Sequence, residues 1–128
     1  MKRIVIVDDS VIIQNELQNF FIEKMGYEVV GIGKDGNEAI ALYKKFKPDL
    51  ITLDITMPNK SGVEALKEIL SIDPTAKVIM VSVINDADKI NDCLLLGAKT
   101  YLEKPLKFNS DIEVEKYQYL IKNIVEQG

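Results

Sequence analysis

Short β-branched runs alternate with helical stretches along the whole chain, and this alternation constrains the fold more than any other feature. The apolar residues of the helical stretches recur at a spacing of three and four, and Gly or Pro marks most of the boundaries. Strands joined through helices form a parallel sheet with helices on both faces. We expect strands over 3–7, 27–32, 50–53, 77–83 and 100–103, and helices over 11–25, 37–46, 63–71, 86–96 and 112–126.

Right-handed crossovers between these strands predict a doubly wound α/β sandwich. We expect the flavodoxin-like (βα)5 form, a parallel five-stranded sheet in the order 2-1-3-4-5. A length of 128 residues with 47% hydrophobic residues suits one domain, which we expect over 1–128. In such a sheet, ligands bind at the carboxyl ends of the first and third strands, where the strand order reverses.

Charge and composition exclude several classes of function. A net charge of −4 argues against nucleic-acid binding through a basic surface. The chain has no histidine, which excludes histidine-based catalytic triads, zinc motifs and phosphorelay through a histidine of this chain. No apolar run approaches the roughly 20 residues of a membrane span, and no signal peptide is visible, so we expect a cytoplasmic protein. The single cysteine, Cys93, is predicted to be a small core residue.

Polar residues follow four of the five predicted strands. Asp8 and Asp9 come after the first strand, Asp54 after the third, Ser82 near the end of the fourth, and Lys104 after the fifth. Parallel strands end at the same edge of a sheet, so we expect these side chains to lie together. Carboxylates about 4 Å apart repel each other by roughly 4 kcal/mol per pair at an effective dielectric constant near 20. Such a cluster requires a cation or a protonated carboxyl group.

This combination of residue types indicates phosphoryl chemistry with Mg²⁺. Magnesium prefers oxygen ligands and often shares its coordination with a phosphoryl group. Lys104 suits a phosphoryl oxygen as a point charge, and Ser82 suits one as a hydrogen-bond donor. Asp54 is then the natural nucleophile, which forms an acyl phosphate. The simpler alternative is that the acids cap helices and that Lys104 pairs with one of them.

These residues resemble the receiver domain of response regulators, of the single-domain chemotaxis (CheY-like) type. The resemblance covers essentially the whole chain. It implies a two-component signalling module rather than a conventional enzyme, one that catalyses only its own phosphorylation and slow dephosphorylation. The segments that carry the resemblance are Asp8-Asp9-Ser10, Leu53-Asp54-Ile55-Thr56-Met57-Pro58 with Gly62, Val81-Ser82 and Lys104-Pro105.

The resemblance implies a role for each residue of the site. Asp54 would be the phosphoacceptor, and the donor would be a phosphohistidine of a sensor histidine kinase. Mg²⁺ would be bound by the side chains of Asp9 and Asp54 and by the backbone carbonyl of Thr56, while Asp8 would act mainly through metal-bound water. Lys104 would hold a phosphoryl oxygen, and its bond to the following proline is cis in similar proteins.

Ser82 and Tyr101 are the switch residues that the resemblance implies. The phosphate oxygens would draw in Ser82, and Tyr101 would rotate inward behind it. A downstream protein would then bind the face built from 87–96, 100–103 and 112–126. Chemotaxis or motility is the favoured pathway, and a phosphorelay intermediate or a regulator of another pathway is the alternative. We expect a monomer or a weak phosphorylation-dependent dimer, without nucleic-acid or membrane contacts.

One departure from the family pattern concerns the lifetime of the phosphoryl group. Val83 stands where the family usually has alanine. A bulkier side chain beside the phosphoryl pocket suggests slow labelling or slow loss of the group. Thr56 and Ile84 occupy positions that tune dephosphorylation in similar domains, and neither carries an acid or amide suited to orienting water.

Two other features suggest partner contacts. Leu95 should face outward from its helix, with Ile90, Cys93 and Leu94 on the inner side, and it is a candidate contact for the downstream protein. The segment 106–111 leaves a longer gap before the last helix than similar proteins show. Its aromatic residue either packs over the end of the sheet or contacts a partner; that residue is Phe108.

Three interpretations from other classes compete with the receiver domain. Gly31, Gly33 and Gly36 match the dinucleotide-binding pattern G-x-G-x-x-G, but the turn would lie on an edge strand, away from the reversal of strand order. A haloacid-dehalogenase-like phosphatase also uses an aspartate nucleophile with Mg²⁺, but Asp54-Ile-Thr56 lacks the second aspartate of that motif. A pseudo-receiver would bind partners without being phosphorylated.

Overall fold

Five strands and five α-helices alternate along the chain in the computed structural model, which describes residues 1–83 and 87–126. Each predicted strand lies within one residue of the observed bounds. The strands are β1 (Arg3–Val7), β2 (Glu28–Gly33), β3 (Leu50–Leu53), β4 (Val78–Ser82) and β5 (Thr100–Glu103). The helices are α1 (Val11–Asn19), α2 (Gly36–Phe46), α3 (Gly62–Ile72), α4 (Ala87–Leu96) and α5 (Asp111–Val125).

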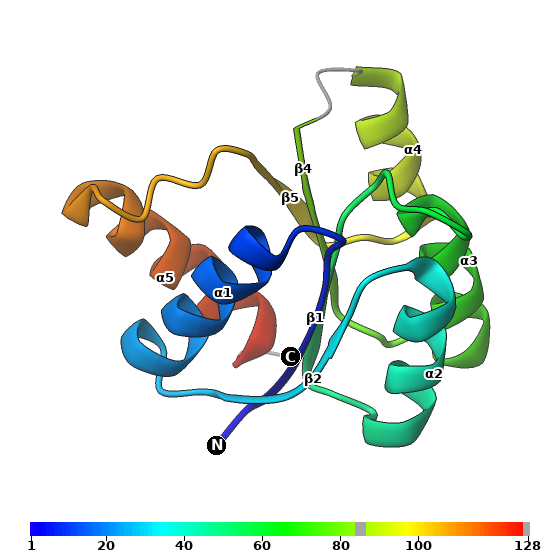
Figure 1. Cartoon of the computed structure of the whole chain (residues 1–128), viewed down its shortest axis with the longest axis horizontal. Helices are drawn as coiled ribbons and strands as arrows, with labels where there is room; N and C mark the ends of the chain where they lie inside the picture. The colour runs from blue at the N-terminus through cyan, green and yellow to red at the C-terminus, as the bar shows by residue number, and fades with distance from the viewer. Residues whose placement is uncertain (84–86, 127–128) are drawn as a thin grey trace.

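The strands form one parallel sheet in the order β2-β1-β3-β4-β5, with α1 and α5 on one face and α2, α3 and α4 on the other (Figure 1). This is the predicted flavodoxin-like α/β sandwich. β3 lies in the middle of the sheet and is buried throughout. Ile51 and Leu53 pack in the core on the side of α2 and α3, and Leu50 packs in the core on the side of α1 and α5. The strand is apolar because helices cover both of its faces.

The first helix differs from the prediction of a continuous helix over 11–25. α1 ends at Asn19, and a turn of π-helix follows over Phe20–Lys24. Two consecutive aromatic rings, those of Phe20 and Phe21, are both buried there. Phe21 stacks on Tyr27 of the following loop, with ring centroids 6.4 Å apart. The wider turn accommodates both rings in the core, which the regular spacing of apolar residues could not reveal.

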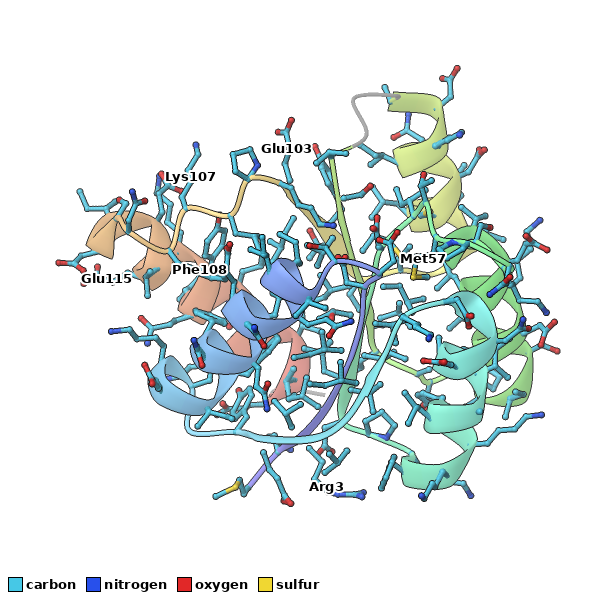
Figure 2. The ribbon with its side chains drawn as sticks, in the orientation of Figure 1. Arg3, Met57, Glu103, Lys107, Phe108 and Glu115 are labelled. Carbon is cyan, nitrogen blue, oxygen red and sulfur yellow. The ribbon has the colours of Figure 1, made fainter. Side chains whose placement is uncertain are left out.

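Segment 106–110 packs against the protein itself. The Phe108 ring stacks on Phe20, with centroids 5.0 Å apart, and meets Tyr117 of α5 edge-on at 5.6 Å. Figure 2 shows Phe108 on the segment that precedes α5. The backbone N–H of Lys107 donates to the Tyr117 hydroxyl at 3.1 Å. Phe108 therefore packs between the π-helical turn and α5. The segment follows a cis peptide bond between Lys104 and its proline, as the resemblance implied.

α4 buries a narrower stripe than the sequence predicted. Cys93 is 1% exposed and lies in the core, and Leu95 is 86% exposed, both as predicted. Leu94, predicted on the inner side, is 39% exposed, so that prediction was wrong. α4 lies beside α3 at the edge of the helical layer, where only Cys93 and the half-buried Ile90 are covered (Figure 1). None of the helices in the described ranges is long and apolar enough to cross a membrane.

Candidate functional site

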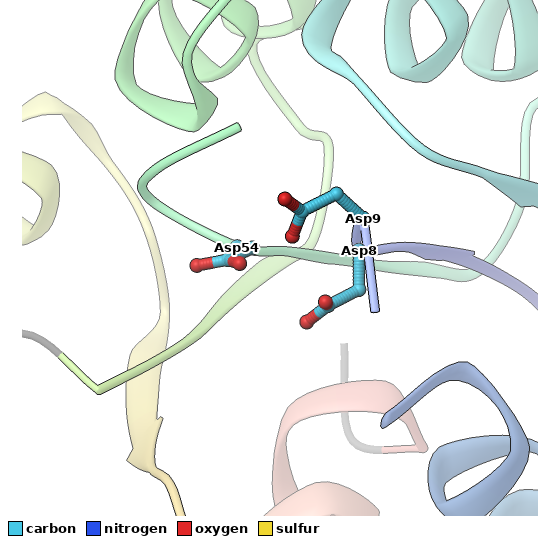
Figure 3. A group of neighbouring side chains, drawn as sticks. All are labelled: Asp8, Asp9 and Asp54. Atoms are coloured by element: carbon cyan, nitrogen blue, oxygen red, sulfur yellow. The ribbon is translucent and has the colours of Figure 1, made fainter. Parts of the chain in front are cut away.

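Three carboxylates gather at the carboxyl edge of the sheet (Figure 3). Asp8 and Asp9 follow β1, and Asp54 follows the neighbouring β3. The backbone N–H of Asp54 donates to the carbonyl of Val7, the last residue of β1, at 3.1 Å. One oxygen of each carboxylate lies within 4.8 Å of the others. Asp8 and Asp54 are buried and Asp9 is exposed, so the cluster opens to solvent on one side. The predicted meeting of these strand ends is confirmed.

Lys104 contacts two of the three acids. Its Nζ lies 2.6 Å from Asp8 Oδ2 and 3.3 Å from Asp54 Oδ2, and its side chain is mostly buried. The Lys104 backbone N–H donates to the Ser82 carbonyl at 3.1 Å, which fixes the start of this side chain at the end of β4. Of the simpler alternative, the pairing of Lys104 with an acid is observed, but helix capping by these acids is not. Ser10 caps α1, and Asp8 instead accepts from the Ser10 backbone N–H at 2.9 Å.

The electrostatics of the cluster favour an additional cation. Burial raises the pKa of Asp54; the adjacent Lys104 opposes this rise and Asp8 adds to it. Three carboxylates against one ammonium group leave an excess of two negative charges when all four groups are ionised. Carboxylate oxygens at a site open on one side are the donor set of hard divalent cations such as Mg²⁺.

The loop after Asp54 is packed too closely to accept a side chain at Gly62. A Cβ atom there would lie 1.9 Å from the backbone carbonyl oxygen of Asp54. The Gly62 N–H instead donates to the Ile55 carbonyl at 2.9 Å, which closes the start of α3 against the loop. Thr56 is exposed between these anchors, and its N–H donates to Asp54 Oδ1 at 3.3 Å. The predicted glycine of this motif therefore has a steric reason.

The remaining predicted residues surround the cluster at different depths. Ser82 is buried at the end of β4, and Tyr101 is exposed on β5. Val83 is also exposed. Ile84 lies outside the described residues. The structure therefore places Ser82 at the strand end beside Lys104, and it leaves Tyr101 38% exposed.

One contact of the site was missed by the sequence analysis. The Gln14 side-chain amide donates to the backbone carbonyl of Asp8 at 2.6 Å and so ties α1 to the acid cluster. Gln14 stands four residues after the cap residue Ser10, on the same side of the helix. That spacing is the only signal in the sequence that could have identified it.

Packing explains the glycines of the dinucleotide-like pattern. Cβ atoms at Gly31 and Gly33 would lie 3.0 Å from Leu42 of α2, and one at Gly36 would lie 2.5 Å from the carbonyl oxygen of Lys60. The pattern runs along the edge strand β2 into α2, and the Gly33 carbonyl accepts from the backbone N–H of Asp8 at 3.0 Å. These glycines let α2 approach β2 and the loop before α3.

Comparison with known proteins identifies the class. The sequence pattern described as "Response regulator receiver domain" matches residues 4–114, and the chain belongs to this family. The chemotaxis protein CheY of Thermotoga maritima is 41% identical over 112 residues, which cover 88% of this chain and 92% of that protein. The predicted CheY-like resemblance is thereby confirmed, and the phosphatase and dinucleotide-binding alternatives have no support.

Two further relatives show how this domain occurs elsewhere. A chain in the crystal structure of a CheX–CheY–BeF3–Mg²⁺ complex from Borrelia burgdorferi superposes on this protein with a TM-score of 0.86 and is 34% identical to it in sequence. The superposition covers 96% of this chain and 88% of that chain. The protein-glutamate methylesterase/protein-glutamine glutaminase of Bacillus licheniformis is 36% identical over the matched region. This region includes all of this chain but only 36% of the length of that enzyme. Receiver domains thus occur both in CheY proteins and within longer proteins.

Proposed function

We propose that this protein is a phosphorylation-switched response regulator in which Asp54 accepts a phosphoryl group from a phosphohistidine of a sensor histidine kinase. The observation that carries the proposal is the contact of Lys104 Nζ with both Asp8 and Asp54 inside a cluster of three carboxylates. We propose a cytoplasmic signalling module over 1–128 that catalyses only its own phosphorylation and slow dephosphorylation. Membership of the receiver family supports this.

The acid cluster fits Mg²⁺ as its cofactor. Its oxygen donors, its excess negative charge and its opening to solvent at Asp9 match the preferences of this ion. We propose that Asp9, Asp54 and the backbone carbonyl of Thr56 would bind it and that Asp8 would act through metal-bound water. When bound, the ion would neutralise negative charge on the phosphoryl group.

The proposed reaction exchanges one bond for another. An ionised oxygen of Asp54 attacks phosphorus, the bond between phosphorus and the histidine nitrogen breaks, and the imidazole of the kinase leaves with that electron pair. Lys104, already 3.3 Å from Asp54 Oδ2, would hold an oxygen of the transferred group. Burial raises the pKa of Asp54, and the adjacent Lys104 opposes this rise and so favours the ionised form that attacks. Catalysis is then mostly positioning and electrostatic stabilisation.

We propose that Ser82 and Tyr101 transmit the change to the face formed by α4, β5 and α5. Ser82 would donate to the new phosphoryl oxygens, and the exposed Tyr101 ring would turn inward. A downstream protein would bind this face, where the exposed Leu95 is a candidate contact. Chemotaxis is the favoured pathway because the Thermotoga and Borrelia relatives are CheY proteins. A phosphorelay intermediate or a regulator of another pathway is the alternative.

Intact-mass analysis after incubation with acetyl phosphate and Mg²⁺ tests the proposal. We expect a gain of one phosphoryl group that is lost in the Asp54→Asn variant and in EDTA. Labelling of Asp54→Asn equal to that of the unaltered protein would refute the assignment of the acceptor. No gain with either acetyl phosphate or a phosphorylated histidine kinase would indicate a pseudo-receiver.

A further inference from the structure

The turn between α2 and β2 holds the loop that leads from Asp54 to α3. Asp35, the N-cap residue of α2, accepts from the backbone N–H of Glu38 through Oδ1 at 2.8 Å. Its other oxygen, Oδ2, accepts from the side-chain amide of Asn59 at 2.8 Å. The next residue, Gly36, donates its N–H to the Lys60 carbonyl, also at 2.8 Å. The start of α2 therefore binds the loop through two adjacent bonds: Asp35 binds Asn59, and Gly36 binds Lys60.

The loop requires such support because its backbone is strained. Asn59 has a φ of 66°, and the Lys60 N–H donates to the Pro58 carbonyl at 2.7 Å, closing a three-residue turn around Asn59. Three-residue turns with a positive φ at the centre are rare and strained. Asparagine tolerates this conformation better than most residues do. A strained backbone persists only where its surroundings hold it, and the bonds from Asp35 and Gly36 do so here.

The same loop carries Thr56, whose backbone carbonyl is a proposed ligand of the divalent cation. Ile55 and Met57 are anchored in the core, and Thr56 lies exposed between them. The strained turn over residues 58–60 begins directly after Met57. The position of Asn59 therefore influences the path of the backbone between Thr56 and the turn. Release of Asn59 would therefore loosen the backbone at Thr56 and Pro58, while the side chains of Ile55 and Met57 stay in the core.

We propose that Asp35, acting through Asn59, is a positioning residue that sets the backbone of residues 54–57 for divalent-cation binding at the acid cluster. The inference rests on the proposed function and deepens it, since Asp35 itself touches neither the acid cluster nor a reacting atom. Hydrogen bonds from the Glu38 N–H and from Asn59 lower the pKa of Asp35, so both of its oxygens act as acceptors at neutral pH.

Two substitutions remove this contact with little other change. Asn59→Gly deletes the amide donor but retains a residue that adopts a positive φ without strain. Asp35→Ser retains a good N-cap residue for α2 but removes the oxygen that accepts from Asn59. The matched control is Ser110→Ala, which removes the N-cap bond of α5 to Glu113 and leaves the loop intact.

The readout is the Mg²⁺ dissociation constant of the unphosphorylated protein, obtained from amide chemical shifts of Asp9 and Thr56 during a titration well below the melting temperature. Hydrogen exchange of residues 55–60 is measured in parallel without the ion. We expect each substitution to weaken Mg²⁺ binding about five-fold and to speed exchange in the loop. We expect the double variant to be no weaker than either single variant, because both act through one hydrogen bond. Ser110→Ala should lower the melting temperature and leave the dissociation constant unchanged.

The outcomes separate this inference from the proposed function. Failure of the unaltered protein to bind Mg²⁺ would overturn both. Normal binding by the unaltered protein, with dissociation constants within two-fold of it in Asn59→Gly and Asp35→Ser, would overturn only the positioning role. A loss of affinity in Ser110→Ala equal to that in the other two would also overturn it, because the effect would then follow stability alone.

Discussion

The Nζ of Lys104 lies closer to Asp8, at 2.6 Å, than to Asp54, at 3.3 Å. The Lys104 ammonium group is thus held mainly by Asp8, and not by Asp54, the proposed phosphoacceptor. Asp54 keeps the longer of the two contacts. The stabilities of variants at Lys104 and Asp54 depend on this arrangement.

Replacing Lys104 with methionine should destabilise the metal-free protein by about 3 kcal/mol, because it leaves two buried carboxylates without their cation. Urea unfolding in EDTA at pH 7 measures this loss. The control is Lys116→Met, which breaks an exposed pair with Glu113 at 3.6 Å and should change stability very little. Equal losses in the two variants would show that the Lys104 contacts do not stabilise the fold.

Asp54→Asn should have opposite effects with and without Mg²⁺. Burial disfavours the ionised form of Asp54, so the amide should raise the melting temperature of the metal-free protein by a few degrees. It should also reduce the further rise that Mg²⁺ causes in the unaltered protein, because one ligand of the ion is lost. Scanning calorimetry in EDTA and in Mg²⁺ measures both. A lower melting temperature in EDTA would contradict the prediction.

Phe108→Ala should destabilise the protein by about 2 kcal/mol, because the ring packs between Phe20 and Tyr117 but is only partly buried. Urea unfolding measures the change. Ile112→Ala, at a position 68% exposed on α5, serves as the control and should change stability by less than about 0.5 kcal/mol. If Phe108→Ala were as stable as this control, segment 106–110 would not be anchored by its aromatic ring.

Tyr43→Phe should change the response of stability to acid. The Tyr43 hydroxyl donates to Asp73 Oδ2 at 2.7 Å. Hydrogen bonds from Thr75 and then from Tyr43 lower the pKa of Asp73 in the folded state. A carboxylate with a lowered folded pKa stabilises the protein above its unfolded pKa, and this stabilisation is lost as the pH falls through the folded value.

The variant lacks one of these bonds, so its melting temperature should be a few degrees lower at pH 7. The two proteins should converge as the pH falls below 3.8, the ordinary pKa of the group, and Asp73 becomes protonated. Melting curves from pH 7 to pH 2 measure this. A difference that stays constant over the whole range would show that the Tyr43 bond does not depend on the charge of Asp73.

Val83→Ala should speed labelling by acetyl phosphate, loss of the phosphoryl group, or both, by about two-fold to ten-fold. Val83 is exposed directly after the buried Ser82, so a smaller side chain there would open the approach to the site without disturbing the core. Intact-mass time courses measure both rates. The melting temperature should stay the same, and unchanged rates would show that Val83 does not restrict access.

The burial of β3 and the meeting of Asp8, Asp9 and Asp54 could be predicted from the amino-acid sequence, and the strand order could be predicted as one of the two common forms of a doubly wound sheet. These features follow from local periodicity and from the rule that parallel strands end at one edge of a sheet. The prediction for α4 shows where such reasoning stops. The inner stripe of a helix depends on how much of it the neighbouring helix covers, and α4 lies at the edge of its layer, so Leu94 is exposed.

The pairs of groups that bind each other could be identified only from the folded structure. Lys104 and Asp8 are 96 residues apart, and Asn59 and Asp35 are 24 residues apart. The π-helical turn at Phe20 likewise accompanies its stacking on Phe108, far along the chain. Hydrogen bonds and ring contacts act over a few ångströms, and local sequence patterns fix positions along the chain only to within a turn or a strand. Such contacts are therefore settled when the layers pack together.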